Sequence, residues 1–201
     1  PRDLAKALSL FQLAAAQGHP GAQFALGLKY ANGIGVPQNH ETARKWYRLS
    51  ADQGYVSAQI NLGFIYANGI GVPQNFTTAY KWYRAAAEQG DDTGQINLGE
   101  LIENGQGVAQ DYATAMKLYR LAAAQGAVIA ANNIGLLYAK GLGVPQDLVR
   151  AYMWFSLGAT SGHPEPIRHR DLIFDKLSPE QVAQAQKMAQ ICLVRQWKDC
   201  D

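Results

Sequence analysis

The stretch ANGIGVPQN occurs twice in this chain, at 31–39 and again at 67–75, and the two copies lie 36 residues apart. The same interval relates a separate series of glycines. Its members are Gly27, Gly63, Gly99 and Gly135. A fixed period of this size indicates a tandem array of small structural units. The repeat therefore decides the fold.

One unit is interpreted as two helices. Small and apolar residues recur at helical spacing over 20–32, and Gly33 can take the positive φ that ends a helix. Pro37 blocks further helix, and Asn39 is a good N-cap for a second helix that ends before Gly54. The equivalent caps are Asn75, Asp111 and Asp147.

The paired glycines of each copy raise the possibility of a phosphate-binding loop. Such a loop leads from a strand into a helix and usually occurs once per domain. In this chain four copies of Gly-x-Gly stand between predicted helices. We therefore interpret them as structural turns.

The consensus of the units is A-x-x-x-L-G-x-x-Y-x-x-G-x-G-V-x-x-(N/D)-x-x-x-A-x-x-W-(Y/F), followed by an alanine-rich helix and a glycine. This pattern resembles the Sel1-like repeat, a relative of the tetratricopeptide repeat, from residue 3 to about 162. The resemblance implies an all-α fold, a right-handed superhelix (solenoid) whose first helices line the concave side. It also implies roles in protein–protein interaction, often as adaptors in bacterial envelopes, signalling or host contact.

We expect a single solenoid over 1–201 with about eleven helices and 36-residue helix pairs. Residues 1–18, from Pro1 on, hold the second helix of a truncated repeat, and whether further repeats precede it stays open. A capping box at 178–181 opens a last helix that runs to about Arg195 and seals the array against water. The expected segments are 1–18, the repeats 19–54, 55–90, 91–126 and 127–162, and a capping helix pair at 163–201.

Composition and spacing argue against several classes of function. The chain has 18 basic and 16 acidic side chains, so its net charge of +2 gives no general affinity for nucleic acid or anionic lipid. No run of about 18 apolar residues is present to span a membrane. The four histidines do not cluster at ligand spacing, and no nucleophile with a base stands out from the repeat. We predict a monomer with no metal, cofactor or catalytic residue, and hence no enzyme.

Cys192 and Cys200 are the only two cysteines. In one continuous helix they would be about 12 Å apart along the axis, so a disulfide requires the chain to reverse near Trp197. Some bacterial members of the family space cysteines in this way across a helix–turn–helix. A bridge, which would indicate an oxidising compartment, and a pair of free thiols both stay open. The compartment also stays open, with a periplasmic or secreted protein slightly favoured over a cytoplasmic one.

Aromatic residues that recur with the period are interpreted as packing between helices, because every unit must bury them. They are Trp46, Trp82, Trp154, Tyr47, Tyr83, Tyr119 and Phe155.

The functional surface is expected on the face of each first helix that packing leaves free, which lines the concave groove by resemblance to tetratricopeptide helices. One position of this stripe carries Asn61, Asn97 and Asn133, whose amides suit an extended peptide backbone. Alternatively, these asparagines bond neighbouring helices as part of the repeat consensus. Phe64 and Leu136 beside them are either exposed side-chain pockets or inter-repeat packing.

The third unit differs in charge. Residues 88–116 contain six acidic residues and neither lysine nor arginine. Glu100 and Glu103 fall on the groove stripe, so a ligand there should offer a basic side chain; the alternative is a solvated charged face.

We therefore predict a scaffold or adaptor that binds a protein or peptide partner, with basic residues opposite the two glutamates. The alternatives are an architectural spacer in an envelope or secretion assembly and, less favoured, an enzyme acting on peptidoglycan or β-lactams, as proposed for some relatives.

Overall fold

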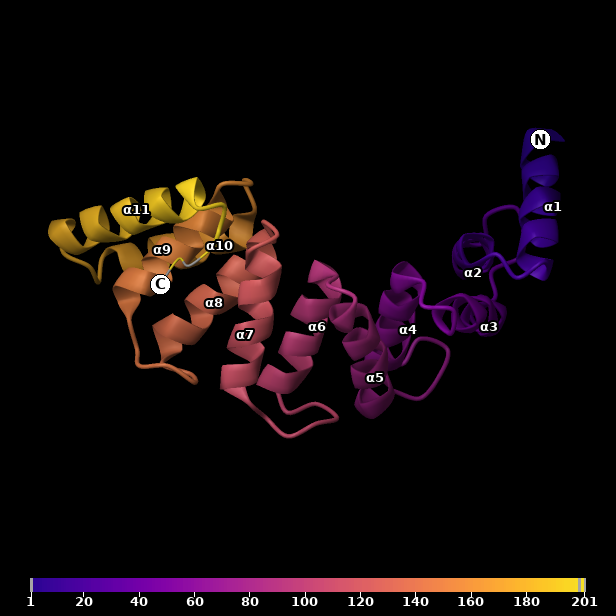
Figure 1. Cartoon of the computed structure of the whole chain (residues 1–201), viewed down its shortest axis with the longest axis horizontal. Helices are drawn as coiled ribbons and strands as arrows, with labels where there is room; N and C mark the ends of the chain where they lie inside the picture. Colours follow the sequence, from indigo (N-terminus) through magenta and orange to yellow (C-terminus); the bar gives the residue numbers. More distant parts are fainter. Residues whose placement is uncertain (1, 199, 201) are drawn as a thin grey trace. The chain divides into compact units, whose positions relative to one another are not determined.

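The structure, a computed structural model, describes residues 2–198 and 200, with side chains from residue 9 onward (Figure 1). Over these residues it consists of eleven α-helices and contains no strand, which confirms the all-α prediction. Pro1 of the predicted first segment lies outside the described residues. The helices are α1 (Arg2–Ala16), α2 (Pro20–Asn32), α3 (His40–Ala51), α4 (Val56–Asn68), α5 (Phe76–Glu88), α6 (Asp92–Glu103), α7 (Tyr112–Ala123), α8 (Val128–Lys140), α9 (Leu148–Ala159), α10 (Pro164–Phe174) and α11 (Pro179–Val194).

The duplicated stretch forms the turn inside each helix pair. Gly33 ends α2 with a φ of +69°, and its N–H donates to the carbonyl of Lys29. The second helix then begins at a side-chain cap, where Asn39 Oδ1 accepts from the N–H of Thr42 at 2.8 Å. The caps at Asn75, Asp111 and Asp147 repeat this arrangement. The Gly-x-Gly segment is thus a turn between two helices.

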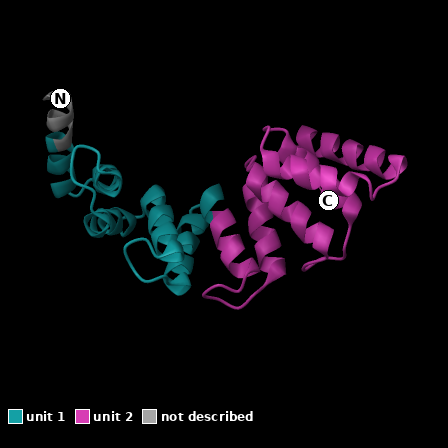
Figure 2. Cartoon of the chain, turned by 180° about the vertical axis from the view of Figure 1, so that it is seen from behind, with its two compact units in different colours: residues 1–94 teal, residues 95–201 magenta. Residues whose placement is uncertain are grey.

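The chain divides into unit 1 (1–94) and unit 2 (95–201), coloured separately in Figure 2, and each is described by itself. In unit 1 each of the helices α1 to α4 packs on the next one along the chain. In unit 2, α7 packs on α8 and α8 on α9, while α10 and α11 both pack on α9. The single solenoid over 1–201 stays a prediction.

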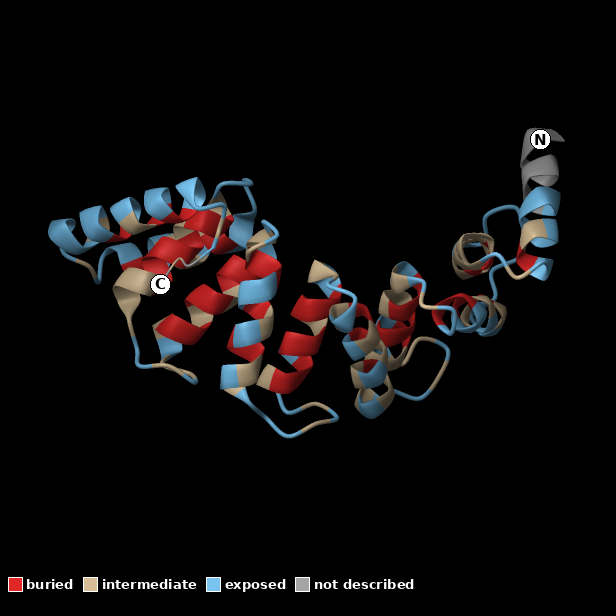
Figure 3. Cartoon of the chain, viewed as in Figure 1, coloured by how far each residue is buried: buried red, intermediate tan, exposed pale blue. Residues whose placement is uncertain are grey.

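Periodic aromatic residues form much of the core, with one difference from expectation. Tyr47 is buried, as are its three equivalents, Tyr83, Tyr119 and Phe155. Trp154 is also buried, within α9, whose buried residues are red in Figure 3. Trp46 and Trp82, however, are only half-buried. Arg48 lies over the ring of Trp82, 4.9 Å from its centroid, so one face of this ring makes a cation–π contact.

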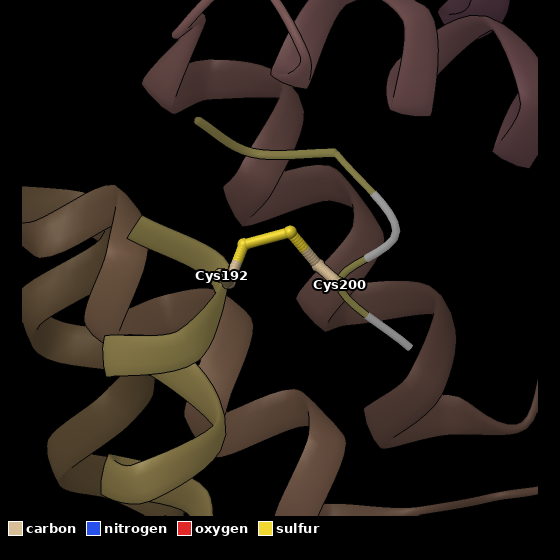
Figure 4. The surroundings of a disulfide bond; sticks show 2 residues. All are labelled: Cys192 and Cys200. Atoms are coloured by element: carbon tan, nitrogen blue, oxygen red, sulfur yellow. A yellow bond between two sulfur atoms is a disulfide. The ribbon is translucent and has the colours of Figure 1, made fainter. Parts of the chain in front are cut away.

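The C-terminal segment caps unit 2 and then reverses. The predicted capping box is present, with Ser178 Oγ accepting from the N–H of Gln181 and Gln181 Oε1 accepting from that of Ser178. Beyond α11, Gln196 and Trp197 take positive φ values of 53° and 64°. This turn brings Cys200 back to Cys192, and the two form a disulfide with a Cα–Cα distance of 4.8 Å (Figure 4). Of the two alternatives for the cysteines, the structure has the bridge.

Candidate functional site

The predicted stripe in unit 1 borders a pocket of about 270 Å³. First helices α2 and α4 and second helix α3 supply most of its wall, which is largely apolar. Phe64 on α4 lies at the edge of this pocket and is 52% exposed. Its side chain therefore faces solvent instead of packing between repeats. Asn61, one turn earlier, is half-buried and lines the same pocket. The structure therefore brings two of the predicted residues together. Other lining residues are Leu28, Ala31, Asn32, His40, Ala43, Tyr47, Ile65 and Ile70.

Asn61 also has a partner inside the repeat. It is hydrogen-bonded to the hydroxyl of Tyr47, whose burial raises its pKa to about 12 while this bond opposes the rise. The phenol is therefore neutral at physiological pH. An amide side chain has two N–H donors and an acceptor oxygen. The bond to Tyr47 agrees with the alternative interpretation, in which Asn61 bonds a neighbouring helix. It occupies only part of the amide, so a donor or acceptor of Asn61 remains for a ligand.

In unit 2 the structure gathers the predicted acidic residues with residues of two further helices. The hydroxyl of Tyr119 on α7 donates to Glu103 Oε2 on α6 at 2.7 Å. Asn133 Nδ2 on α8 donates to Glu100 Oε1 at 3.4 Å. We call Glu100, Glu103, Tyr119 and Asn133 the acidic cluster. Among the described residues, neither glutamate forms an ion pair with a lysine or arginine.

Burial and like charge shape the electrostatics of the acidic cluster. The pKa of Glu100 is raised by burial and, less strongly, by the nearby charge of Glu103, while the bond from Asn133 opposes the rise. Over a third of the surface of Glu100 is exposed. Its pKa is nevertheless raised, because protein atoms pack around the carboxylate group itself. Burial raises the pKa of Tyr119, and its donation to Glu103 raises it further, so Tyr119 stays protonated at physiological pH. The cluster presents carboxylate oxygens that would attract a basic side chain.

The two remaining predicted residues lie outside these contacts. Asn97 on α6 is half-buried one turn before Glu100, and Leu136 on α8 is half-buried one turn after Asn133. Leu136 occupies the position of Phe64 in its repeat, but it is far less open to solvent.

A glutamine series that sequence reasoning missed holds successive helices together. Buried Gln23 donates to the carbonyl of Ala15 at 3.2 Å and accepts from Gln53 at 2.8 Å. Gln59 repeats both bonds 36 residues later, with the carbonyl of Ala51 and with Gln89. The signal was available in the sequence, because these glutamines recur with the period. Their bonds are internal, so they are structural residues.

Over 2–198 and 200, no group of three or more His, Cys, Asp or Glu side chains could hold a metal ion. In the same part of the chain, no helix is both long and apolar enough to cross a membrane.

The Sel1 repeat matches the chain five times in succession, at 1–19, 20–55, 56–91, 93–126 and 128–163. The chain belongs to the Sel1 repeat family. Sel1 repeat proteins generally serve as scaffolds for protein interaction.

Solved structures support this assignment. A protective antigen of uropathogenic Escherichia coli with an SLR fold is 34% identical, with a TM-score of 0.87 over 98% of this chain. The Sel1 repeat chain spans 42% of that antigen. A Sel1 repeat protein from Oxalobacter formigenes is 37% identical over 85% of this chain and 73% of its own, with a TM-score of 0.75. Comparison with curated protein sequences found no match.

Proposed function

We propose that this Sel1 repeat chain is an interaction scaffold that binds an extended or helical segment of a partner protein on the free faces of its first helices. The observation that carries the proposal is Phe64, a phenylalanine 52% exposed beside an apolar pocket of about 270 Å³. Concave, mainly apolar pockets with a few polar groups are typical of binding sites. Leu28 and Leu136 hold the same repeat position and are half-buried, so exposure here is not a requirement of the fold.

The pocket of unit 1 would receive an apolar side chain of the partner. Burying such a side chain contributes about 1.5–3 kcal/mol. Asn61 at the pocket wall would bond the peptide group next to that side chain with the donor or acceptor that Tyr47 does not use. Apolar anchor side chains and hydrogen bonds to the peptide backbone both recur in peptide recognition.

The acidic cluster of unit 2 would bind a lysine or arginine of a partner. Glu100 and Glu103 lie on first helix α6, and Glu100 accepts from Asn133 on first helix α8. An ion pair on a partly exposed surface contributes only about 0.2–1 kcal/mol. Its main effect is therefore on the choice of partner and on the association rate.

Site-specific photo-crosslinking in cells tests this function. A photoreactive phenylalanine analogue replaces Phe64 in one variant and Leu49 in the other. Leu49 is a control matched in exposure, at 49%, and lies on second helix α3 beside a separate pocket. We expect a discrete cross-linked protein from position 64 and not from position 49. No specific product from position 64 would contradict the proposal and favour an architectural spacer.

A further inference from the structure

A second pocket, of about 570 Å³, lies in unit 2 on a surface that the first helices do not form. Its wall comes from the second helices α7 and α9 and from the C-terminal loop that the Cys192–Cys200 disulfide closes. We call it the cationic pocket. Its principal lining residues are Lys117, Arg120 and Leu121 of α7, Trp154 of α9, and Trp197 and Lys198 of the loop.

The lining combines positive charge with an apolar floor. Lys117 and Lys198 are exposed on α7 and on the loop, and no acidic residue lines the pocket within the described part of the chain. Arg120 adds a third cation and donates to the hydroxyl of Tyr138 at 3.0 Å, which holds its side chain in place. Asp199 lies within this loop in sequence and Asp201 directly follows it, and both are outside the described residues.

The two tryptophans define what else a ligand must offer. Trp197 is half-buried and supplies the accessible indole of the pocket, whereas Trp154 is 2% exposed and offers a ligand almost no surface. An indole is apolar except for one N–H donor and has no acceptor for a cation. A ligand that satisfies such a wall carries a carboxylate next to an aromatic or aliphatic group.

We propose that the cationic pocket binds an acidic segment of a partner protein, with a carboxylate between Lys117 and Lys198 and an apolar side chain against Trp197. Nucleic acid fits less well, because binding along its backbone needs an extended basic track. The whole chain has a net charge of only +2. The cationic pocket would bind a negatively charged segment, whereas the acidic cluster would bind a positively charged one, and the two sites are independent.

The disulfide makes this binding dependent on redox state. Trp197 and Lys198 lie between the two bonded cysteines, and the N–H of Trp197 donates to the carbonyl of Cys192 at 2.9 Å. Gln196 and Trp197 both hold positive φ, which residues other than glycine rarely adopt. Reduction would free Cys200 and release the loop from this conformation. One wall of the cationic pocket would then be lost.

Nuclear magnetic resonance of the full chain, labelled with nitrogen-15, tests both statements, because its four tryptophans give separate indole signals. The probe is a hexapeptide of alternating glutamate and phenylalanine, and its control has glutamine in place of glutamate. We expect the glutamate peptide to shift the Trp154 and Trp197 signals and the glutamine peptide to leave them unchanged. Equal effects of the two peptides, or shifts confined to Trp46 and Trp82, would overturn the proposal.

Charge-reversed variants and a reducing agent complete the test. We expect Lys117→Glu with Lys198→Glu to weaken peptide binding by about tenfold or more, since two charge contacts become repulsive. Lys176→Glu with Lys187→Glu changes net charge equally at exposed sites away from the pocket and should alter affinity less than about twofold. Reduction of the wild type should weaken binding to a similar extent as the first pair. Equal binding by reduced and oxidised protein would overturn the redox dependence, and equal effects of the two variant pairs would overturn the site.

Discussion

Gly27 lies against the ring of Tyr47: a Cβ placed on this glycine would be 2.4 Å from both Cδ1 and Cε1 of the tyrosine. The contact joins first helix α2 to second helix α3 of one repeat. The same close approach recurs for Gly63 with Tyr83, Gly99 with Tyr119 and Gly135 with Phe155. The conserved spacing of glycines within this one chain therefore reflects helix pairs that leave no space for a side chain.

Replacing Gly27 by valine should destabilise the protein by about 1–3 kcal/mol or more, because the added side chain overpacks the contact with Tyr47. Gly21→Val is the matched control on the same helix, since a Cβ there would meet only ordinary contacts, the nearest at 3.8 Å from Tyr55. Urea unfolding followed by circular dichroism measures both. If Gly27→Val unfolds at the same urea concentration as the wild type, the close-packing account is wrong.

Glu100→Gln should stabilise the protein at neutral pH. The pKa of Glu100 is raised above its ordinary value of 4.5, chiefly by burial, so the folded state binds this proton more tightly than the unfolded state. Ionisation therefore costs stability above the folded pKa, and the cost fades as the pH falls through that pKa and is absent below 4.5. Since the residue is over a third exposed, solvent screening limits the gain to about 1 kcal/mol or less.

Glu180→Gln provides a control of opposite sign for Glu100→Gln. The hydroxyl of Ser178 donates to Glu180 at 2.6 Å and lowers the pKa of that carboxyl. Its ionised form therefore favours folding above the ordinary pKa, and this contribution is lost as the pH falls through the lowered pKa. Melting temperatures between pH 3 and pH 8 should show Glu180→Gln falling behind the wild type as the pH rises towards 4.5 and Glu100→Gln gaining on it above 4.5. Parallel curves for all three proteins would contradict the assigned causes.

The disulfide between Cys192 and Cys200 should be detected in unreduced protein from an oxidising compartment, as an intact mass lower by two hydrogen atoms. Cys200→Ser should lower the stability of the C-terminal cap by about 2–3 kcal/mol, because the closed loop is short. Hydrogen exchange of α11 measures this loss locally. Free thiols in such material would contradict the bridge.

Much of the fold could be predicted because the residues that end and begin its helices recur in each repeat. Gly33 and Asn39 mark the ends of two helices, and each has equivalents at the same period. A reversal near Trp197 was required only if Cys192 and Cys200 are bridged, an alternative that the sequence left open, and both the reversal and the bridge are present. Such features depend on local backbone geometry, which a short stretch of sequence determines.

The candidate sites could be predicted only in part, because their properties depend on neighbours that the period does not specify. Phe64 and Leu136 share a repeat position, yet only Phe64 is exposed. Asn61 could be placed on the stripe, but its bond to Tyr47 depends on the approach of two helices. The cationic pocket depends on the C-terminal loop, which lies outside the repeat, so no periodic signal indicated it.

Changing Glu100 and Glu103 together to lysine should slow association with a partner and remove its salt dependence, because surface charges steer the encounter. It should also cost about 1–3 kcal/mol of stability, because the buried Tyr119 hydroxyl loses its acceptor. Asn97→Ala should instead raise the dissociation rate, since it would leave peptide groups unpaired. Surface plasmon resonance at several salt concentrations separates the two rates. Unchanged rates for both variants would place the partner on another surface of the chain.

The central claim, that the free face of the first helices binds a partner, is tested most directly by the affinity of Phe64→Ser and Leu49→Ser for the cross-linked protein. The two apolar residues are 52% and 49% exposed, so their loss should have similar effects on folding. Losing an apolar contact of about 1.5–3 kcal/mol should weaken binding by about 10- to 100-fold for Phe64→Ser. Leu49→Ser should bind like the wild type. Equal affinity of Phe64→Ser and the wild type, or a larger loss at Leu49, would contradict the account.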